Sequence, residues 1–281
     1  MKKILLLSLT VVVFGVMVKL GFWQLDRGQQ KQRIEQQLQQ WQQGDAVSLA
    51  TALSSEAVEL TGRKVAVRVA PITSQQLPIK TVYWDNQTWQ GKVGYLVFQP
   101  VKIIDSDLNA SQIVLLELGF VAAGRDRQTL PQVASVTQAQ SIEGRLYRRQ
   151  DNPLSEGLMV ENMPQTSAIR IQNLALESLA QDWKMPLLGY VIQPMTNLEL
   201  RDGKQVSEQL PHPWTPVPLS SKRHFGYAVQ WFSMATVLLL LVVMFVYRAF
   251  QPQKFNGLER HTDLEKHHDL KKDNDKEGNL E

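Results

Sequence analysis

Hydrophobic residues gather into two long runs, one near each end of the chain. Residues 4–18 contain no charged side chain, and after Lys19 the run continues to Trp23, so residues 4–23 form a stretch of 20. A helix rises about 1.5 Å per residue, which makes this stretch roughly 30 Å long and able to cross the hydrocarbon core of a bilayer. Residues 225–247 form the second run, with 23 residues and no Asp, Glu, Lys or Arg. The pattern predicts two transmembrane helices, at 4–23 and 225–247.

The first run also resembles a cleaved signal peptide, because Lys2 and Lys3 precede an apolar segment. No small-x-small cleavage site closes that segment, since residues 18–21 read Val-Lys-Leu-Gly. We therefore favour an uncleaved anchor. Two spans place both chain ends on one side of the membrane, and we expect that side to be the cytoplasm, because a long domain is translocated largely regardless of its charge. This predicts a multi-pass protein of the cell inner membrane whose main domain is periplasmic.

Between the two runs the pattern changes twice. Residues 24–43 are mostly polar, with Ile34, Leu38 and Trp41 on one face of a helix that Gly44 ends. From Gly62 apolar residues alternate with polar ones, which indicates a half-buried strand closed by Pro71. Further strands are expected at 81–84, 95–98, 113–122, 140–147 and 187–193, with a turn at 85–86 and one helix at 174–183 capped by Asn173. We predict a β-rich domain, either an antiparallel sheet or a small barrel, with a short helix.

Two segments near the C-terminus are unlike this domain. The stretch 209–224 carries four prolines, which indicates an extended, stiff connector. The last 34 residues carry 7 basic and 8 acidic side chains and few apolar ones, so they cannot bury a core. The predicted organisation is a cytoplasmic N-terminus (1–3), a transmembrane helix (4–23), a membrane-proximal helix (24–43), a periplasmic β-rich domain (44–208), a connector (209–224), a second transmembrane helix (225–247) and a charged, disordered cytoplasmic tail (248–281).

Composition excludes several functions. The 30 Lys and Arg side chains nearly balance 27 Asp and Glu, giving a net charge of +3, so no nucleic-acid partner is expected. The chain has no cysteine, which excludes disulfides, thiolate metal sites and a cysteine nucleophile. It contains none of the motifs G-x-S-x-G, H-E-x-x-H or S-x-x-K, and no glycine-rich nucleotide-binding loop. Hydrolytic chemistry therefore finds little support in the sequence.

The five histidines differ in their surroundings. His261, His267 and His268 lie in the charged tail, and His212 lies between two prolines, where a surface loop is the ordinary interpretation. His224 instead stands at the outer end of the second apolar run, and on a helix it shares a face with the aromatic residues Tyr227 and Trp231. A histidine at that depth can ligate the iron of a porphyrin, or it can simply bind lipid headgroups. Met159 and Met163 give only a weak indication of a copper site.

Four segments resemble the surfeit locus protein 1 family. Residues 20–27, LGFWQLDR, are similar to its hallmark L-G-x-W-Q-x-x-R at the end of the first membrane helix, and residues 224–232, HFGYAVQWF, are similar to H-x-x-Y-A-x-Q-W-F at the start of the second. Residues 94–100 match G-Y-x-V-x-x-P, and residues 143–146 match x-G-x-L. One departure is clear. Where the family reads N-R-G-W, this chain reads Glu117-Leu118-Gly119-Phe120, so no role of that arginine can be transferred.

The resemblance implies a function. Family members have two helices flanking a large domain and assist the assembly of cytochrome c oxidase, and some bacterial members bind haem a through a histidine that corresponds to His224. Trp23 and Gln24 occupy the matching outer end of the first helix, so the resemblance implies a haem a site made of His224, Tyr227, Trp231, Trp23 and Gln24, with His224 as axial ligand of the iron. The implied partners are cytochrome c oxidase subunits, above all subunit 1, haem a synthase and the lipid bilayer.

Two alternatives remain open at this point. In one, the protein is a scaffold without a cofactor, and the two hallmarks are a helix-packing seam in which Gln24 bonds Gln230. In the other, the protein is a periplasmic metallochaperone or sensor that uses methionine and histidine.

Overall fold

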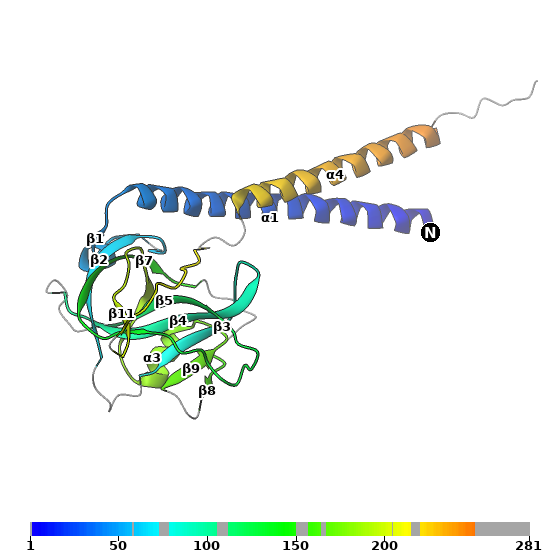
Figure 1. The fold of residues 1–281 in the computed structure, drawn as a ribbon. Helices are drawn as coiled ribbons and strands as arrows, with labels where there is room; N and C mark the ends of the chain where they lie inside the picture. The colour runs from blue at the N-terminus through cyan, green and yellow to red at the C-terminus, as the bar shows by residue number, and fades with distance from the viewer. Residues whose placement is uncertain are drawn as a thin grey trace, which may run out of the picture. The chain divides into compact units, whose positions relative to one another are not determined.

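The computed structural model describes residues 2–57, 59–72, 79–105, 112–149, 157–163, 167–203, 205–214 and 220–250 (Figure 1). The chain divides into two compact units. The first comprises Met1–Asp26 with His224–Glu281, and the second comprises Arg27–Arg223. The first unit is a pair of helices, and the second is a β-rich domain with the end of the first helix packed on it. Each unit is described in turn.

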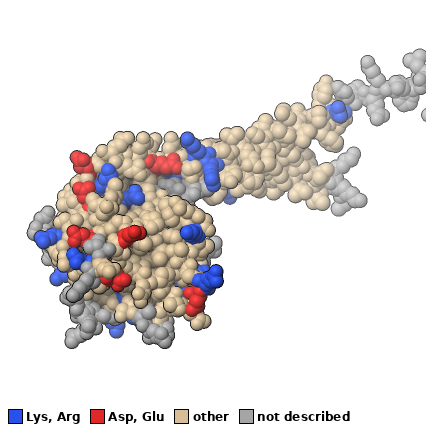
Figure 2. Space-filling view, viewed as in Figure 1, with Lys and Arg blue, Asp and Glu red and all other residues tan. Residues whose placement is uncertain are grey.

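The two predicted transmembrane segments are helical. Helix α1 spans Lys2–Gln43 and helix α4 spans Ser221–Phe250. Both are long and apolar enough to cross a membrane, and their apolar side chains are largely exposed in the chain alone. On the face shown in Figure 2, most of the helix pair is uncharged, whereas basic and acidic side chains are mixed over the β-rich unit. The predicted combination of two membrane helices and a β-rich domain is thereby confirmed.

The start of α4 corrects the predicted connector, because residues 221–224 are helical rather than extended. The carboxylate of Glu35 explains this start. Its Oε1 accepts a hydrogen bond from the backbone N–H of Ser221 at 2.9 Å, and its Oε2 accepts one from the Ser221 hydroxyl at 2.6 Å. A negative group bound to the first amides satisfies donors that have no partner within the helix and interacts favourably with the helix dipole. The sequence of the connector alone could not reveal a cap supplied from a residue 186 positions away.

The end of α1 packs on the β-rich unit as the apolar stripe predicted. Leu38 is buried, and Trp41 packs against the core of the domain. The helix ends at Gln43, where the ammonium group of Lys64 donates to the carbonyl oxygens of Gln42, at 2.6 Å, and Gly44, at 3.2 Å. A cation at this end binds carbonyl groups that the helix leaves unpaired. The predicted membrane-proximal helix is thus anchored by both apolar and polar contacts.

A closed ring of five strands forms the centre of the domain. Strand order runs β2–β7–β10–β5–β4 and returns from β4 to β2. The barrel alternative is therefore confirmed. The ring is not purely antiparallel, however, because β10 and β5 pair in parallel. The five strands are β2 (Lys64–Pro71), β4 (Lys92–Ile103), β5 (Ile113–Ala122), β7 (Gln140–Tyr147) and β10 (Leu187–Pro194).

The remaining elements add to the ring. Strand β3 pairs with β4, β9 pairs in parallel with β3, and β8 follows β9, while β1 pairs with β2; β6, β11 and β12 form a separate small sheet. Most of these elements were not predicted, because strands of two to four residues leave no readable alternation. Their bounds are β1 (Val47–Ser48), α2 (Leu49–Leu53), β3 (Thr81–Trp89), β6 (Ser135–Val136), β8 (Glu161–Asn162), β9 (Ala168–Ile171), α3 (Leu176–Trp183), β11 (Leu200–Asp202) and β12 (Gln205–Val206).

The two faces of the central strands belong to two different cores. In β4, Tyr95 and Val97 are buried in one cluster, whereas Leu96 and Phe98 are buried in the other. The second cluster includes residues of α3, such as Leu179, so this helix covers the outer face of the barrel. Successive residues of a strand point to opposite faces. A strand covered on both faces therefore reads as a continuous apolar run, as β4 and β5 do.

Two local predictions were wrong. Asn173 does not cap α3. The cap position is Ala175, which makes no side-chain bond, while the Asn173 amide donates to the carbonyl oxygen of Gly157 and accepts from Arg149. The pair Asp85-Asn86 is not a turn between strands, because β3 continues through it with a register shift and a φ of 58° at Asn86. This is a bulge, in which asparagine tolerates the left-handed conformation.

Gly94 provides a test of the packing between β4 and β5. A Cβ atom at this position would lie 2.1 Å from the carbonyl oxygen of Val121 and 2.8 Å from the Cα of Ala122. Gly94→Ala should therefore lower the free energy of unfolding by about 2 kcal/mol, the usual cost of forcing an extra methyl group into packed structure. Gly189→Ala is the matched control in β10, because nothing lies within 4 Å of its Cβ position. Thermal unfolding of the detergent-purified variants measures both, and equal midpoints would contradict the close approach.

Candidate functional site

The first candidate site lies on the face of α4 that is turned toward α1. His224, Ala228 and Ala235 are buried, with exposed fractions of 7%, 1% and 3%. Spacings of four and seven residues place these three on one side of a helix. Small side chains at such positions let two helices approach closely in a membrane. The face that carries His224 is thus an interface between helices.

The imidazole of His224 bonds the side chain of Gln24. The distance between His224 Nδ1 and Gln24 Oε1 is 2.8 Å. An amide oxygen only accepts hydrogen bonds, so Nδ1 carries the hydrogen in this contact. In a neutral imidazole the lone pair then belongs to Nε2, the tautomer that histidine ligands of metals use when Nδ1 binds a neighbouring acceptor. One contact therefore joins the two sequence hallmarks and sets the orientation of the ring.

Packing next to this bond explains the glycine of the first hallmark. The rings of Phe22 and Phe232 meet edge to face with centroids 5.2 Å apart. A Cβ atom on Gly21 would lie 2.7 Å from the ring of Phe232. Only glycine at position 21 therefore leaves room for the ring of Phe232 to pack this closely. This contact lies about one helical turn from Gln24.

The other predicted site residues are arranged less compactly. Trp23 is 56% exposed and Tyr227 is 47% exposed, while Trp231 is partly buried. Gln230, the expected partner of Gln24 in the scaffold alternative, is exposed, and Gln24 bonds His224 instead. The structure thus brings His224 and Gln24 together, but it leaves the aromatic rings of Trp23 and Tyr227 on the outer surface of the helix pair.

The chemistry of these side chains is compatible with haem binding. A histidine with an orienting hydrogen bond on Nδ1 is the common arrangement of an axial ligand, and exposed aromatic rings next to it offer apolar area to a porphyrin. The burial of His224 acts against easy access, because the imidazole lies within the helix contact. The donor set therefore fits, whereas access to it requires the helices to part or the ring to turn.

A second polar site lies inside the β-rich unit and was missed by the sequence analysis. Glu117, in β5, is only 2% exposed. Its carboxylate accepts hydrogen bonds from Gln193 Nε2, at 3.1 and 3.0 Å, and lies 2.9 Å from His212 Nδ1. His212 is therefore not a free surface histidine, which corrects that interpretation. The sequence showed that Glu117 departs from the family pattern. It did not show that Gln193 in β10 and His212 in the connector would bind this side chain.

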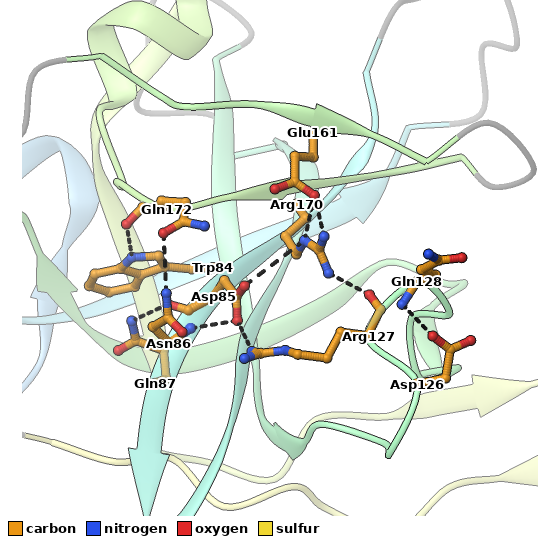
Figure 3. A network of polar contacts seen from close by, with 10 residues as sticks. All are labelled: Trp84, Asp85, Asn86, Gln87, Asp126, Arg127, Gln128, Glu161, Arg170 and Gln172. Carbon is orange, nitrogen blue, oxygen red and sulfur yellow. Dashed lines mark hydrogen bonds and ion pairs between the residues drawn. The ribbon is translucent and has the colours of Figure 1, made fainter.

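A third polar cluster ties the edge of the sheet together (Figure 3). Asp85, which is 5% exposed, binds Arg127 and lies 3.9 Å from Arg170. Arg170 also binds Glu161 and donates to the carbonyl oxygen of Arg127. Each charge in this cluster has an opposite charge or a carbonyl group as partner. The cluster therefore joins β3, β8, β9 and the segment after β5, and we assign it a structural role.

Support for a metal site is absent from the described part of the chain. No group of three or more histidine and carboxylate side chains there could hold a metal ion. Met159 is exposed, whereas Met163 packs against the barrel core. His261, His267 and His268 lie outside the described residues.

Fold and site together define a class of protein, namely a membrane protein with two helices that flank one barrel domain and meet through a histidine–glutamine contact. The model of the SURF1 family matches residues 11–236, and the chain belongs to this family. The chain is 24% identical to a SURF1-like protein of Rickettsia conorii, with 84% of this chain and 89% of that protein covered. It is 23% identical to a SURF1-like protein of Rickettsia felis, with 84% and 94% covered. The resemblance inferred from the motifs is confirmed.

The contact at Gly21 can be tested by cross-linking. Because the natural chain has no cysteine, cysteines placed at positions 24 and 224 would report only on this pair. We expect a disulfide between them on mild oxidation, and we expect Gly21→Val to lower its yield several-fold, since the added side chain displaces Phe232. Gly15→Val serves as control, because nothing lies within 4 Å of that Cβ position. An unchanged yield in the Gly21 variant would show that the helices do not meet as described.

Proposed function

We propose that this protein is an assembly factor for cytochrome c oxidase, with a non-enzymatic role, that holds haem a during maturation of the oxidase. It acts in the cell inner membrane, with both termini in the cytoplasm and the barrel domain in the periplasm. Membership of the SURF1 family and the two apolar helices support this proposal. Its partners are oxidase subunits, above all subunit 1, together with haem a synthase and the lipid bilayer.

The observation that carries the proposal is the contact between His224 and Gln24. The most distinctive motifs of the chain lie 200 residues apart in sequence, yet their polar side chains are 2.8 Å apart. A glutamine–histidine bond between two apolar helices is costly to leave unmade in a low-dielectric environment. A site under such a constraint is a natural candidate for function.

His224 would hold the iron of haem a through Nε2. When bound, haem a supplies an iron centre that accepts this nitrogen. Gln24 holds the ring by its Nδ1 hydrogen, while Trp23, Tyr227 and Trp231 provide apolar surface beside it. Because access to His224 requires the helix contact to loosen, occupancy and release are coupled to helix packing. Such coupling suits a protein that must pass its cofactor on.

A scaffold without a cofactor is the second candidate, and the burial of His224 favours it. In this interpretation the histidine only fixes the helix pair through Gln24, and the protein holds oxidase subunits together through its helices and barrel. The two functions differ in what they require of residue 224. As an iron ligand, residue 224 must offer a nitrogen atom to the metal. As a helix-packing residue, it needs only to donate a hydrogen bond to Gln24.

Asparagine at position 224 separates the two functions. Its amide nitrogen lies near the position of the histidine Nδ1 and can still donate a hydrogen bond to Gln24, but it offers no nitrogen in place of the histidine Nε2. We expect His224→Asn and His224→Ala to lose co-purifying haem and the a-type band in reduced-minus-oxidised spectra of membranes. Gln24→Ala should weaken haem retention about 10- to 100-fold, the usual effect of removing the partner of a metal-bound histidine.

The matched control is Gln230→Ala, which removes an exposed glutamine of the same helix pair and should leave haem content unchanged. Normal haem content and oxidase assembly in His224→Asn, combined with loss in His224→Ala, would overturn the ligand role and support the seam. All variants are compared at equal amounts of protein in the membrane.

A further inference from the structure

A cavity of about 170 Å³ lies in the β-rich unit, and none of the residues discussed as a haem site lines it. Aromatic side chains form much of its wall: β3 contributes Trp84 and Trp89, β7 contributes Tyr147, and the connector contributes Trp214. Glu117 and Gln193 add polar groups. For comparison, an apolar cavity of about 150 Å³ holds a benzene molecule, so this space suits a ligand of six to eight heavy atoms.

Glu117 is the charged residue of the cavity wall, and its charge is incompletely matched. Among the described residues its one ion-pair partner is His212, a group that is charged only when protonated. Arg145 is nearby, but Gln193 intervenes: Arg145 Nε donates to Gln193 Oε1 at 2.7 Å, and Gln193 Nε2 donates to Glu117. A buried carboxylate is costly when its ion-pair partner is neutral. A cation in the cavity would reduce that cost.

The aromatic walls suit the same kind of ligand. Two rings of this region already make cation–π contacts. The guanidinium group of Arg145 lies 3.7 Å from the ring centroid of Trp214, and the guanidinium group of Arg149 lies 5.3 Å from the ring centroid of Trp84. Burial lowers the pKa of Arg145 to about 10 and raises the pKa of Tyr147, since both side chains are partly removed from solvent. Charge–ring attraction is stronger in such surroundings than in solvent.

One buried donor in the wall also lacks a partner. The indole Nε1 of Trp214 is buried and makes no hydrogen bond with the described residues. Buried indole N–H groups usually have an acceptor. A ligand that carries an oxygen atom close to its positive charge would supply one.

We infer that this cavity binds a small organic ammonium ion bearing an oxygen acceptor, of the ethanolamine or choline type. The ammonium group faces Glu117 and the aromatic rings, and the oxygen accepts from Trp214 Nε1. The ligand is either a free amino alcohol or the same group as the head of a phospholipid. Because every residue involved lies in the β-rich unit, this inference is independent of the role proposed for His224.

Equilibrium dialysis of the full-length protein in a maltoside detergent, with isotope-labelled choline, tests the inference. We expect saturable binding of one choline per chain. The neutral molecule 3,3-dimethyl-1-butanol has the same shape with carbon in place of nitrogen, and it should compete at least about tenfold more weakly, since it lacks the charge. Glycerophosphocholine distinguishes the sources: binding as tight as that of choline identifies a lipid headgroup, and much weaker binding identifies a free amino alcohol.

Variants connect the binding to the cavity. Glu117→Gln keeps the shape of the side chain and removes its charge, so choline affinity should fall about tenfold or more. Trp89→Leu removes one partly exposed ring and should lower affinity several-fold, and it keeps the test decisive if Glu117→Gln does not fold. Glu143→Gln, the same substitution at an exposed position of β7, should leave affinity unchanged. Absence of saturable binding, equal affinity for the neutral isostere, or equal effects of the Glu117 and Glu143 variants would each overturn the inference.

Discussion

The pairing of β2 with β4 is the interaction on which the rest of the domain depends. Val69, Ala70 and Pro71 pair with residues 101–103, and this short contact turns an open sheet into a ring. Closure pairs the ends of β2 and β4 with each other and gives the barrel an interior that apolar side chains fill. Within the ring, β10 pairs with both β7 and β5, so that Arg145, Gln193 and Glu117 form one continuous polar row. The end of α1 and the connector pack on a surface that exists only once the ring is closed.

The connector shows how such a surface determines the structure of a segment with little preference of its own. The amide of Phe120 donates to the carbonyl oxygen of Pro211 at 2.7 Å, and Gln193 Nε2 donates to that of Pro213 at 2.9 Å. Gly119, with a φ of 121°, lies against Leu210, where a Cβ would approach within 2.5 Å. Prolines offer acceptors but no donors. The connector is thus bound through its carbonyl groups to donors that the barrel leaves available.

The helix pair follows a different rule. Its helices have little hydrophobic reason to associate within a membrane, where the surrounding lipid is equally apolar, so close packing and polar bonds decide their contact. Gly21 allows Phe232 to approach, and His224 bonds Gln24. These contacts explain why the two motifs combine small, aromatic and amide-bearing residues. They also link the proposed cofactor ligand, His224, to the packing of the helices.

Sequence by itself determined the elements whose signal is local and long. The two apolar runs, the stripe of Leu38 and Trp41, and the alternation in β2 each repeat a period that one element imposes on its own residues. The family could also be inferred, because its motifs are dense and contiguous. Tertiary structure alone decided the closure of the ring, the parallel pairing of β10 with β5, the cap that Glu35 supplies to α4, and the partners of Glu117 and His224. Each of these joins residues far apart in the chain, and no local pattern encodes the partner of a buried polar group, because that partner is selected by the fold that excludes water from around it.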